Sequence, residues 1–153
     1  MQSATDKEWL MRLRDCCRRH GLRVTPQREA IYKELYGSRR HPTAEQMHAR
    51  IQRRYSSISL DTVNRTLLTF AKIGLVDIVE GYGSPRRYDP NRGSHHHAHC
   101  IKCGAILDFE SPELDKLKVP AAVRREFKVL NRRVVFSGLC AKCAGGLGKR
   151  ESK

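Results

Sequence analysis

Apolar residues in the first half of the chain recur at the three- and four-residue spacing of one helical face, which predicts four helices. The apolar face of the first helix is made of Trp9, Leu10, Leu13 and Cys17. This helix ends near Gly21, because glycine readily takes the left-handed conformation found at helix ends. Cys16 and Cys17 are predicted to be packing residues, since adjacent thiols cannot easily share one tetrahedral metal site.

Residues that favour helix starts mark the second and third helices. Thr25 offers a hydroxyl cap before Pro26, whose fixed backbone angle suits the first helical position, and that helix ends by Gly37. The segment 43–46, Thr-Ala-Glu-Gln, has the pattern of a capping box and opens a third helix that runs through Ile51.

The fourth helix is the candidate for reading DNA. It starts after the cap Ser59, ends at Gly74, and has an apolar face made of Leu60, Val63, Leu67, Phe70 and Ala71. The opposite face shows Asp61, Thr62, Arg65 and Thr69, with Asn64 near the edge. The predicted DNA contacts of this helix are Ser59, Thr62, Asn64 and Arg65. Thr, Asn and Arg side chains read base edges in DNA, although most such helix faces are only solvated.

Strand-like runs follow at 75–80 and 86–88, joined by the turn-rich segment 81–85. Helices followed by a basic hairpin predict a winged helix-turn-helix DNA-binding domain over residues 1–89. Arg23, before the second helix, is a predicted minor-groove or phosphate contact, and Arg86 and Arg87 on the hairpin are predicted phosphate contacts.

The pattern changes after the polar segment 90–94, which we predict to be a hinge. Beyond it, strands are predicted at 97–101, 105–109 and 129–136. A mostly helical segment is predicted at 113–127. These elements form a small α/β domain over 95–148, followed by a basic, disordered tail at 149–153, so the fold class is α+β.

The charge of the chain favours a polyanionic partner. Thirty Lys and Arg residues against 16 Asp and Glu residues give a formal net charge of +14, which points to nucleic acid before an acidic small molecule. A membrane surface is the competing partner. However, no apolar run approaches the roughly 20 residues of a spanning helix, and the N-terminus has no signal-peptide pattern. We therefore expect a soluble, cytoplasmic protein that does not act at a membrane.

Two Cys-x-x-Cys pairs form the strongest chemical signal: Cys100 with Cys103, and Cys140 with Cys143. Each pair fits a tight turn whose thiolates share one tetrahedral ion, so the two pairs complete a closed structural zinc site with no coordination position left for catalysis. Disulfides, free buried thiols and redox pairs are the alternatives, and the absence of a signal sequence weighs against disulfides.

Histidines gather just before the first cysteine pair, in the run His95, His96, His97, Ala98, His99. Asp89 precedes this run and Asp108 follows it. Alternation along a strand would place His95, His97 and His99 on one face and His96 on the other. Imidazoles mixed with carboxylates suit an exchangeable iron, manganese or zinc ion, whereas a solvated histidine-rich loop is the alternative.

The chain resembles the ferric-uptake-regulator family along almost its whole length. The resemblance is carried in order by five motifs, at 21–28, 41–45, 59–70, 95–104 and 140–143. Members of that family are homodimers of winged-helix domains joined to α/β dimerisation domains. The resemblance implies a structural Zn²⁺ and a regulatory Fe²⁺ or Mn²⁺ in each subunit, the regulatory ion bridging the two domains. It also implies double-stranded DNA with a near-palindromic operator as the partner.

The resemblance further implies that His41, Asp89, His95, His97 and Asp108 form the regulatory site. Asp108 is similar to the peroxide-responsive branch, whereas iron-responsive members more often have Glu there. In that branch ferrous iron reacts with hydrogen peroxide and a ligand imidazole is oxidised, so that the metal and then the DNA are released. His41 and His95 are the oxidation-sensitive positions that this branch nominates.

Three positions depart from the family pattern. Asn64 stands in the recognition helix where members commonly have Tyr, so direct reading of a thymine methyl group is not implied there. Ser94 and Arg132 occupy the positions of a further metal site seen in some iron-responsive members. Neither is a good ligand, which favours one regulatory site in each subunit.

The sequence is thus interpreted as a repressor that senses peroxide, and not as an enzyme. An iron- or zinc-availability sensor that represses metal uptake genes is the alternative within the same class. A mononuclear iron oxygenase is the enzyme alternative, but five protein ligands leave little room for both substrate and oxygen. A zinc storage protein would explain the histidines but not the recognition helix.

Overall fold

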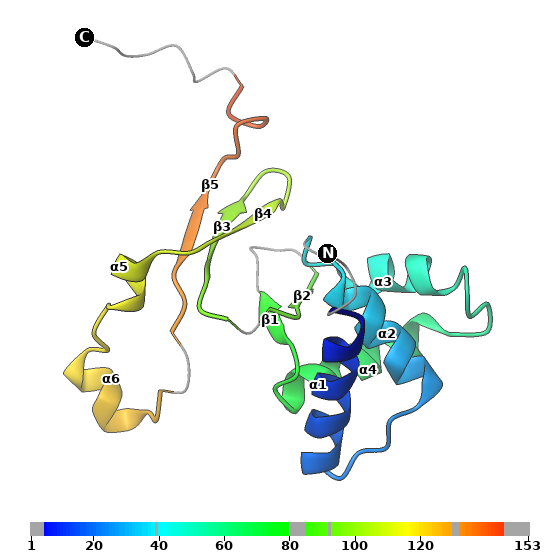
Figure 1. Ribbon diagram of the computed structural model, residues 1–153. Helices are drawn as coiled ribbons and strands as arrows, with labels where there is room; N and C mark the ends of the chain where they lie inside the picture. The colour runs from blue at the N-terminus through cyan, green and yellow to red at the C-terminus, as the bar shows by residue number, and fades with distance from the viewer. Residues whose placement is uncertain (1–4, 39, 80–84, 92, 130–131, 146–153) are drawn as a thin grey trace. The chain divides into compact units, whose positions relative to one another are not determined.

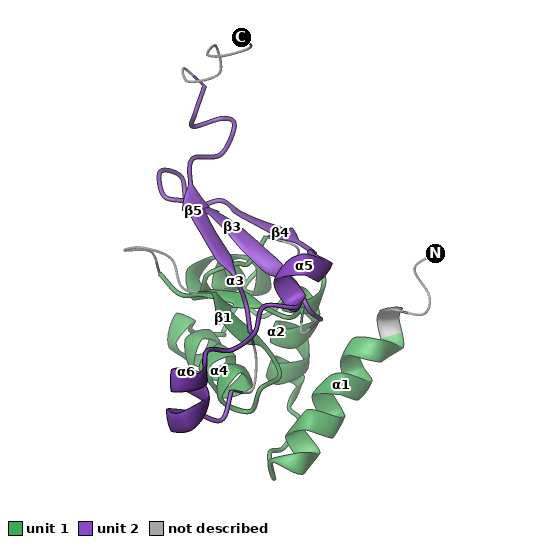
Figure 2. Cartoon of the chain, turned by 90° about the vertical axis from the view of Figure 1, so that its left-hand side faces the viewer, with its two compact units in different colours: residues 1–92 green, residues 93–153 purple. Residues whose placement is uncertain are grey.

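The chain divides into two compact units, Met1–Arg92 and Gly93–Lys153, coloured separately in Figure 2. The computed structural model describes residues 5–38, 40–79, 85–91, 93–129 and 132–145. The division lies inside the polar segment 90–94. None of the helices in these described ranges is both long and apolar enough to cross a bilayer.

The first unit contains, among its described residues, four helices and one two-stranded sheet (Figure 1). These elements are α1 (Thr5–Arg19), α2 (Pro26–Tyr36), α3 (Ala44–Ile51), α4 (Leu60–Lys72), β1 (Asp77–Val79) and β2 (Arg87–Asp89). The two strands are antiparallel, with Ile78 opposite Tyr88. Helices followed by a hairpin confirm the predicted winged-helix architecture. The predicted turn at 81–85 lies outside the described residues, apart from Pro85.

The helix starts follow from local hydrogen bonds. The Thr25 hydroxyl accepts the backbone N–H of the residue three positions on, at 3.3 Å. Thr43 and Gln46 form the predicted capping box: each accepts the backbone N–H of the other, at 3.3 and 3.1 Å. The Ser59 hydroxyl accepts the N–H of Thr62 at 3.1 Å. These caps satisfy backbone donors that a helix start leaves without partners.

The core of the first unit lies among the four helices and the hairpin. Its fully buried side chains include Leu13, Cys17, Ile31, Leu35, Met47, Val63 and Leu67. Tyr32 meets Phe70 edge-on, with 5.7 Å between ring centroids. The expectation that Leu60 is buried was wrong. Leu60 is 40% exposed because it is the first residue of α4, and Thr66 is buried within the helix instead.

The described part of the second unit is a three-stranded sheet with two short helices. These elements are β3 (His96–Cys100), β4 (Ile106–Phe109), α5 (Pro112–Asp115), α6 (Ala121–Glu126) and β5 (Val135–Gly138). The strand order is β4-β3-β5, with β3 antiparallel to β4 and parallel to β5. Mixed helix and sheet confirm the α+β class.

Two predictions for this unit were wrong in extent. Residues 113–127 are not mostly helical, because the helix ends at Asp115 and resumes only at Ala121. Pro120 explains the break: it has no N–H to donate and disfavours a helical backbone in the residue before it. The last strand begins at Val135 rather than at residue 129, since β3 offers partners only from His97 to Cys100.

Candidate metal centres

The four cysteines lie at two turns that the sheet brings together. Cys100 ends β3, and Cys103 follows in the turn toward β4, where the Gly104 N–H donates to the Cys100 carbonyl at 2.8 Å. Cys140 and Cys143 follow β5, the parallel neighbour of β3. The four sulfur atoms lie within 4.8 Å of one another, and the Sγ atoms of Cys103 and Cys140 are 3.7 Å apart. Four thiols in this arrangement suit one tetrahedral zinc ion.

The thiols of this cluster differ in acidity. The backbone N–H of Cys140 donates to the Cys100 sulfur at 3.3 Å, and this contact is the main reason that the pKa of Cys100 is lowered to about 6. The pKa of Cys143 is raised to about 12, chiefly by side-chain hydrogen bonds with Cys103 and then Cys140. Four clustered thiolates therefore need a cation to coexist, and a divalent metal fits this donor set.

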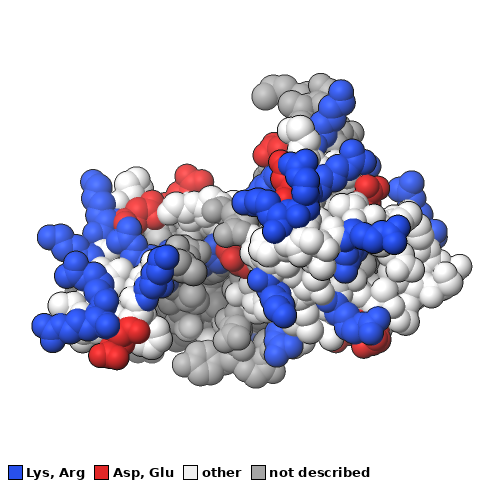
Figure 3. Space-filling view, turned by 90° about the horizontal axis from the view of Figure 1, so that it is seen from below, with Lys and Arg blue, Asp and Glu red and all other residues white. Residues whose placement is uncertain are grey.

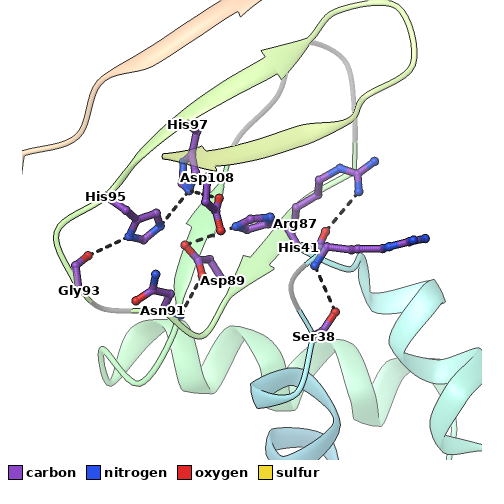
Figure 4. A network of polar contacts seen from close by, with 10 residues as sticks. Ser38, His41, Arg87, Asp89, Asn91, Gly93, His95, His97 and Asp108 are labelled. Carbon is purple, nitrogen blue, oxygen red and sulfur yellow. Dashed lines mark hydrogen bonds and ion pairs between the residues drawn. The ribbon is translucent and has the colours of Figure 1, made fainter. Parts of the chain in front are cut away.

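In the first unit, His41 and Asp89 form a buried pair. The His41 Nε2 atom lies 3.6 Å from Asp89 Oδ2, and both side chains are 2% exposed. The other carboxylate oxygen of Asp89 accepts the backbone N–H of Asn91 at 2.8 Å. This contact fixes the carboxylate while Oδ2 is left on the side of the imidazole, as Figure 4 shows.

The loop that carries His41 is held by β2. His41 has a φ of 45°, in the left-handed region that residues other than glycine seldom occupy. Arg87 donates from Nη1 to the His41 carbonyl at 3.2 Å, and the Tyr88 N–H donates to the Pro42 carbonyl at 3.1 Å. An unusual backbone conformation kept by neighbouring contacts is common at functional sites. Sequence reasoning missed this role of Arg87 because it was assigned to DNA phosphate.

In the second unit, His95, His97 and Asp108 converge (Figure 4). The His95 Nδ1 atom lies 2.8 Å from the Gly93 carbonyl oxygen. A carbonyl can only accept, so Nδ1 carries the proton and Nε2 of the neutral ring keeps its lone pair. That Nε2 lies 3.1 Å from His97 Nε2, which lies 3.4 Å from Asp108 Oδ1. A backbone contact that orients an imidazole in this way is typical of metal-binding histidines.

His96 points to the opposite side of β3, as the alternation predicted. Its ring lies 5.5 Å from that of Phe109, and its Nδ1 accepts the backbone N–H of Val134 at 3.2 Å. Because Nδ1 accepts, a neutral ring carries its proton on Nε2, which lies 3.4 Å from Asp115 Oδ1. The Ser94 hydroxyl donates to the same carboxylate oxygen. His96 therefore links β3, β5 and α5, and its Nε2 lone pair is not offered to a metal.

The predicted DNA-contacting residues lie on α4 and around it. Ser59 and Thr62 are at the start of the helix, with 2.9 Å between their hydroxyl oxygens. Arg65 is exposed and pairs with Asp61 at 3.3 Å, whereas Asn64 is half-buried. Arg23 and Arg86 are both exposed. Arg28, which sequence reasoning did not nominate, lines a hollow of α4 with Thr62, Arg65, Thr66 and Thr69.

Residues 19–137 match the ferric uptake regulator family. The chain is 36% identical to the peroxide-responsive repressor PerR of Staphylococcus epidermidis over 126 residues, which cover 82% of this chain and 84% of that protein. The Helicobacter pylori ferric uptake regulator Fur, whose structure has three functional metal binding sites, aligns over 95% of both chains with a TM-score of 0.75 and 26% identity.

A second solved structure, the ferric uptake regulator of Pseudomonas aeruginosa with manganese, aligns with a TM-score of 0.68 and 25% identity, covering 84% of this chain and 97% of that one. The family match spans well over half of the sequence and includes both groups of histidine and carboxylate side chains as well as the first cysteine pair. The chain therefore belongs to the ferric uptake regulator family.

Proposed function

We propose that this chain is a transcriptional repressor that binds DNA as a homodimer when a regulatory metal is bound, and that hydrogen peroxide releases it from DNA. The observation that carries the proposal is the convergence of His95, His97 and Asp108, with the lone pair of His95 directed by the Gly93 carbonyl. The name of the Staphylococcus epidermidis relative supports the peroxide signal.

Cys100, Cys103, Cys140 and Cys143 hold one structural Zn²⁺ in each subunit. The donor set is all thiol, and each pair lies on a tight turn, as in closed zinc sites. An ion at this place ties the β3–β4 turn to the segment after β5. Its role is therefore to keep the second unit folded and able to pair with a second copy.

The regulatory ion takes ligands from both units. His41 and Asp89 offer one nitrogen and one oxygen in the first unit, and the second unit offers His95, His97 and Asp108. Imidazole and carboxylate together suit Fe²⁺ or Mn²⁺, and two or three donors alone do not fill the coordination of such an ion. A shared ion would restrict the angle between the units and so select a DNA-competent arrangement.

Peroxide sensing follows from where the ligands are held. Ferrous iron, when bound, supplies the electrons that turn hydrogen peroxide into a strong oxidant. His41 and His95 are kept in place by Arg87 and Gly93, so a short-lived oxidant meets the same ring carbons each time. A ring C–H bond would be replaced by a C–OH bond that keeps one oxygen atom of the peroxide, while the other oxygen leaves as water. The ring supplies the two electrons of this oxidation, so the electron lent by the iron would return to it. The oxidised imidazole is a poorer ligand, which favours the arrangement that does not bind DNA.

The DNA contacts are made by α4 and its surroundings. Thr62, Asn64 and Arg65 face the base edges, and Ser59, Arg23 and Arg86 contact the backbone. The partner is double-stranded DNA with a near-palindromic operator, because a symmetric dimer presents two copies of α4. Arg87 donates one hydrogen bond from Nη1 to the His41 carbonyl. Its contact with a DNA phosphate would therefore use the other N–H groups of the guanidinium.

The test compares iron-loaded with manganese-loaded protein after a small excess of peroxide. Operator binding is measured beside peptide mass spectrometry that locates gains of one oxygen. We expect the iron form to lose DNA as His41 or His95 gains oxygen, and the manganese form to keep both unchanged. His96 is an internal control, because it is buried next to His95 at the start of β3 but its lone pair accepts the backbone N–H of Val134.

Two results would overturn the peroxide signal. In one, the iron form stays on DNA with His41 and His95 unmodified. In the other, release follows oxidation of the zinc cysteines. A sensor of iron or zinc availability that represses metal uptake genes would then take its place. The names of the Helicobacter pylori and Pseudomonas aeruginosa relatives favour that second candidate, in which DNA binding follows metal concentration alone.

A further inference from the structure

The positive charges of the two units differ in how they are paired. In the first unit, four arginines lie 2.6 to 3.7 Å from a carboxylate oxygen: Arg14, Arg18, Arg50 and Arg65. Such exposed pairs contribute little to stability, but each reduces the charge that the surface presents to a polyanion. Four of the eight cations of α1, α3 and α4 are therefore offset within the unit.

A short segment of the second unit is cationic without such pairing. Residues 116–128, termed here the cationic segment, contain five exposed cations: Lys116, Lys118, Arg124, Arg125 and Lys128. Glu126 is the one acidic residue in the segment, so its net charge is +4 (five minus one). Among the carboxylates that the structure describes, none forms an ion pair with any of these five side chains. Figure 3 shows Lys and Arg gathered at its left edge, the side on which α5 and α6 lie in Figure 1.

The apolar residues of the cationic segment serve another purpose. Leu117, Val119 and Val123 line a cavity of about 330 Å³ together with His96 and Val134 of the sheet side. Lys118 also lines this cavity, whereas the other four cations of the segment do not. α6 has only six residues, and a helix that lies on a membrane needs a long apolar face as well as charge. The segment therefore fits a polyanion better than a lipid surface.

The spread of the cations points to nucleic acid backbone. They lie in the loop after α5, on α6 and just after α6. Of the five, Lys118 alone lines the cavity, so the cations are spread out and not gathered around a single anion. DNA phosphates repeat at short intervals and are bound by such dispersed Lys and Arg side chains without a fixed geometry. The winged-helix unit of the same chain brings duplex DNA to a high effective concentration.

We propose that the cationic segment contacts phosphates of duplex DNA outside the base pairs that α4 reads, and raises the affinity without adding sequence specificity. This inference rests on the proposed function in one respect: the winged-helix unit must bind the DNA first. The added contacts should appear only on DNA longer than the operator, and they should weaken steeply with salt.

The test uses the full-length, zinc-containing dimer with manganese. One variant removes three cations from the cationic segment: Arg124→Gln, Arg125→Gln and Lys128→Gln. A matched control removes three exposed cations from α1: Lys7→Gln, Arg18→Gln and Arg19→Gln. Binding is measured against salt on an operator duplex, on a duplex three times as long with the operator at its centre, and on a random duplex of that longer length. Zinc content and dimer mass establish that both variants are folded.

On the long duplex, the segment variant should lower the slope of log affinity against log salt by about 5.4, since three cations are lost from each of the two subunits and each phosphate contact contributes about 0.9. The control should change this slope by less than one. On the operator duplex, the two variants should behave alike. The proposal is wrong if the segment variant matches the control on the long duplex, or if it loses as much on the operator duplex.

A further arm tests the membrane as the partner. Vesicles of phosphatidylcholine and phosphatidylglycerol are titrated with the wild-type protein and with the segment variant. Loss of vesicle binding in the variant with unchanged long-duplex binding would assign the segment to a lipid surface and overturn the DNA assignment. Failure of the proposed function would give a different result. The wild-type protein would then show no metal-dependent binding to the operator, while the salt slopes of the wild type and the segment variant on random duplex would still test the segment.

Discussion

All buried hydrophobic side chains in the described part of the chain belong to the first unit, with the exception of Cys100. In the second unit, by contrast, Leu107, Phe136 and Phe127 are 66%, 53% and 70% exposed, and the buried side chains of β3 are mainly histidines. The first unit is therefore held together by its own core. The second unit has the sheet and the polar side chains of a domain but not the apolar interior.

This difference has a physical consequence for stability. A domain of about 60 residues buries too little surface to be more than marginally stable, so metals or partners often supply the rest. The second unit offers both means: a four-thiol cluster at one end of its sheet and exposed apolar side chains along it. Exposed apolar area of this kind is typical of a surface that a second copy covers. It supports the proposed homodimer.

The largest effect that we predict is on the second unit alone. Cys140→Ser should remove the zinc ion, the protection of the β3–β5 amides from hydrogen exchange, and the dimer, because binding of a structural zinc in small domains is worth about 10–16 kcal/mol. The first unit should keep its thermal transition. Zinc analysis, hydrogen exchange and dimer mass are the measurements.

A matched substitution in the first unit is the control for this prediction. Cys17 is fully buried in the helical core, and desolvation raises the pKa of its thiol. Cys17→Ser should cost about 1–3 kcal/mol, since it places a hydroxyl in an apolar site, while the zinc content stays at one ion in each subunit. A stable, zinc-free dimer of the Cys140→Ser protein would show that the second unit does not depend on the ion.

The next effect contrasts two phenylalanines. Phe70→Ala should cost about 3–5 kcal/mol, because its ring is fully buried between helices. Phe136→Ala should cost less than about 1 kcal/mol within the unit, since its ring is half exposed and only stacks on Phe109. Denaturant titration followed by the fluorescence of Trp9, the one tryptophan in the chain, measures the first unit, and hydrogen exchange of the β3–β5 amides measures the second. Equal losses for both variants would contradict the difference between the units.

The comparison also tests whether one ion joins the units. His41→Ala and His95→Ala should each weaken Mn²⁺ binding by about 100-fold or more if both side chains are ligands of the same ion. His96→Gln changes a side chain that adjoins the ligands but is not one of them, so it should weaken Mn²⁺ binding by about 10-fold or less. Calorimetric titration of the zinc-loaded protein gives the three affinities. If His41→Ala binds Mn²⁺ as tightly as the wild type, His41 is not a ligand; if Asp89→Ala does so too, the site is confined to the second unit.

The same contrast explains what the sequence could predict. The helix starts at Thr25, Thr43 and Ser59 were predictable because a cap depends on a few neighbouring residues. In the second unit, the helix is interrupted between Asp115 and Ala121 because of Pro120. This signal is local, but our prediction followed the apolar pattern of residues 113–127 instead. The start of β5 depended on which residues of β3 were available, which no local pattern encodes.

The candidate site divides in a similar way. The cysteine pairs were found from spacing alone, since each pair occupies one turn. His41 was found only through the family resemblance, because a single histidine before proline has no pattern of its own. Its left-handed backbone and the hydrogen bond from Arg87 are tertiary features. The role of His96 also depended on a distant partner, the backbone N–H of Val134.

The smallest predicted effect lies at the start of α4, where stability and DNA binding can be separated. Ser59→Ala should cost about 1 kcal/mol, because the N–H of Thr62 loses its acceptor, and the large core of the first unit should tolerate that loss. Ser59→Asp should restore the stability, since Asp is an equally good cap and its charge suits the start of a helix. If Ser59 also contacts DNA, the Asp variant should be stable and yet bind the operator more weakly than the Ala variant, because its carboxylate meets the phosphates. Thermal unfolding and operator titration at fixed salt measure the two quantities. Operator binding by Ser59→Asp as tight as that of the wild type would remove Ser59 from the DNA contacts and leave it only the role of a cap.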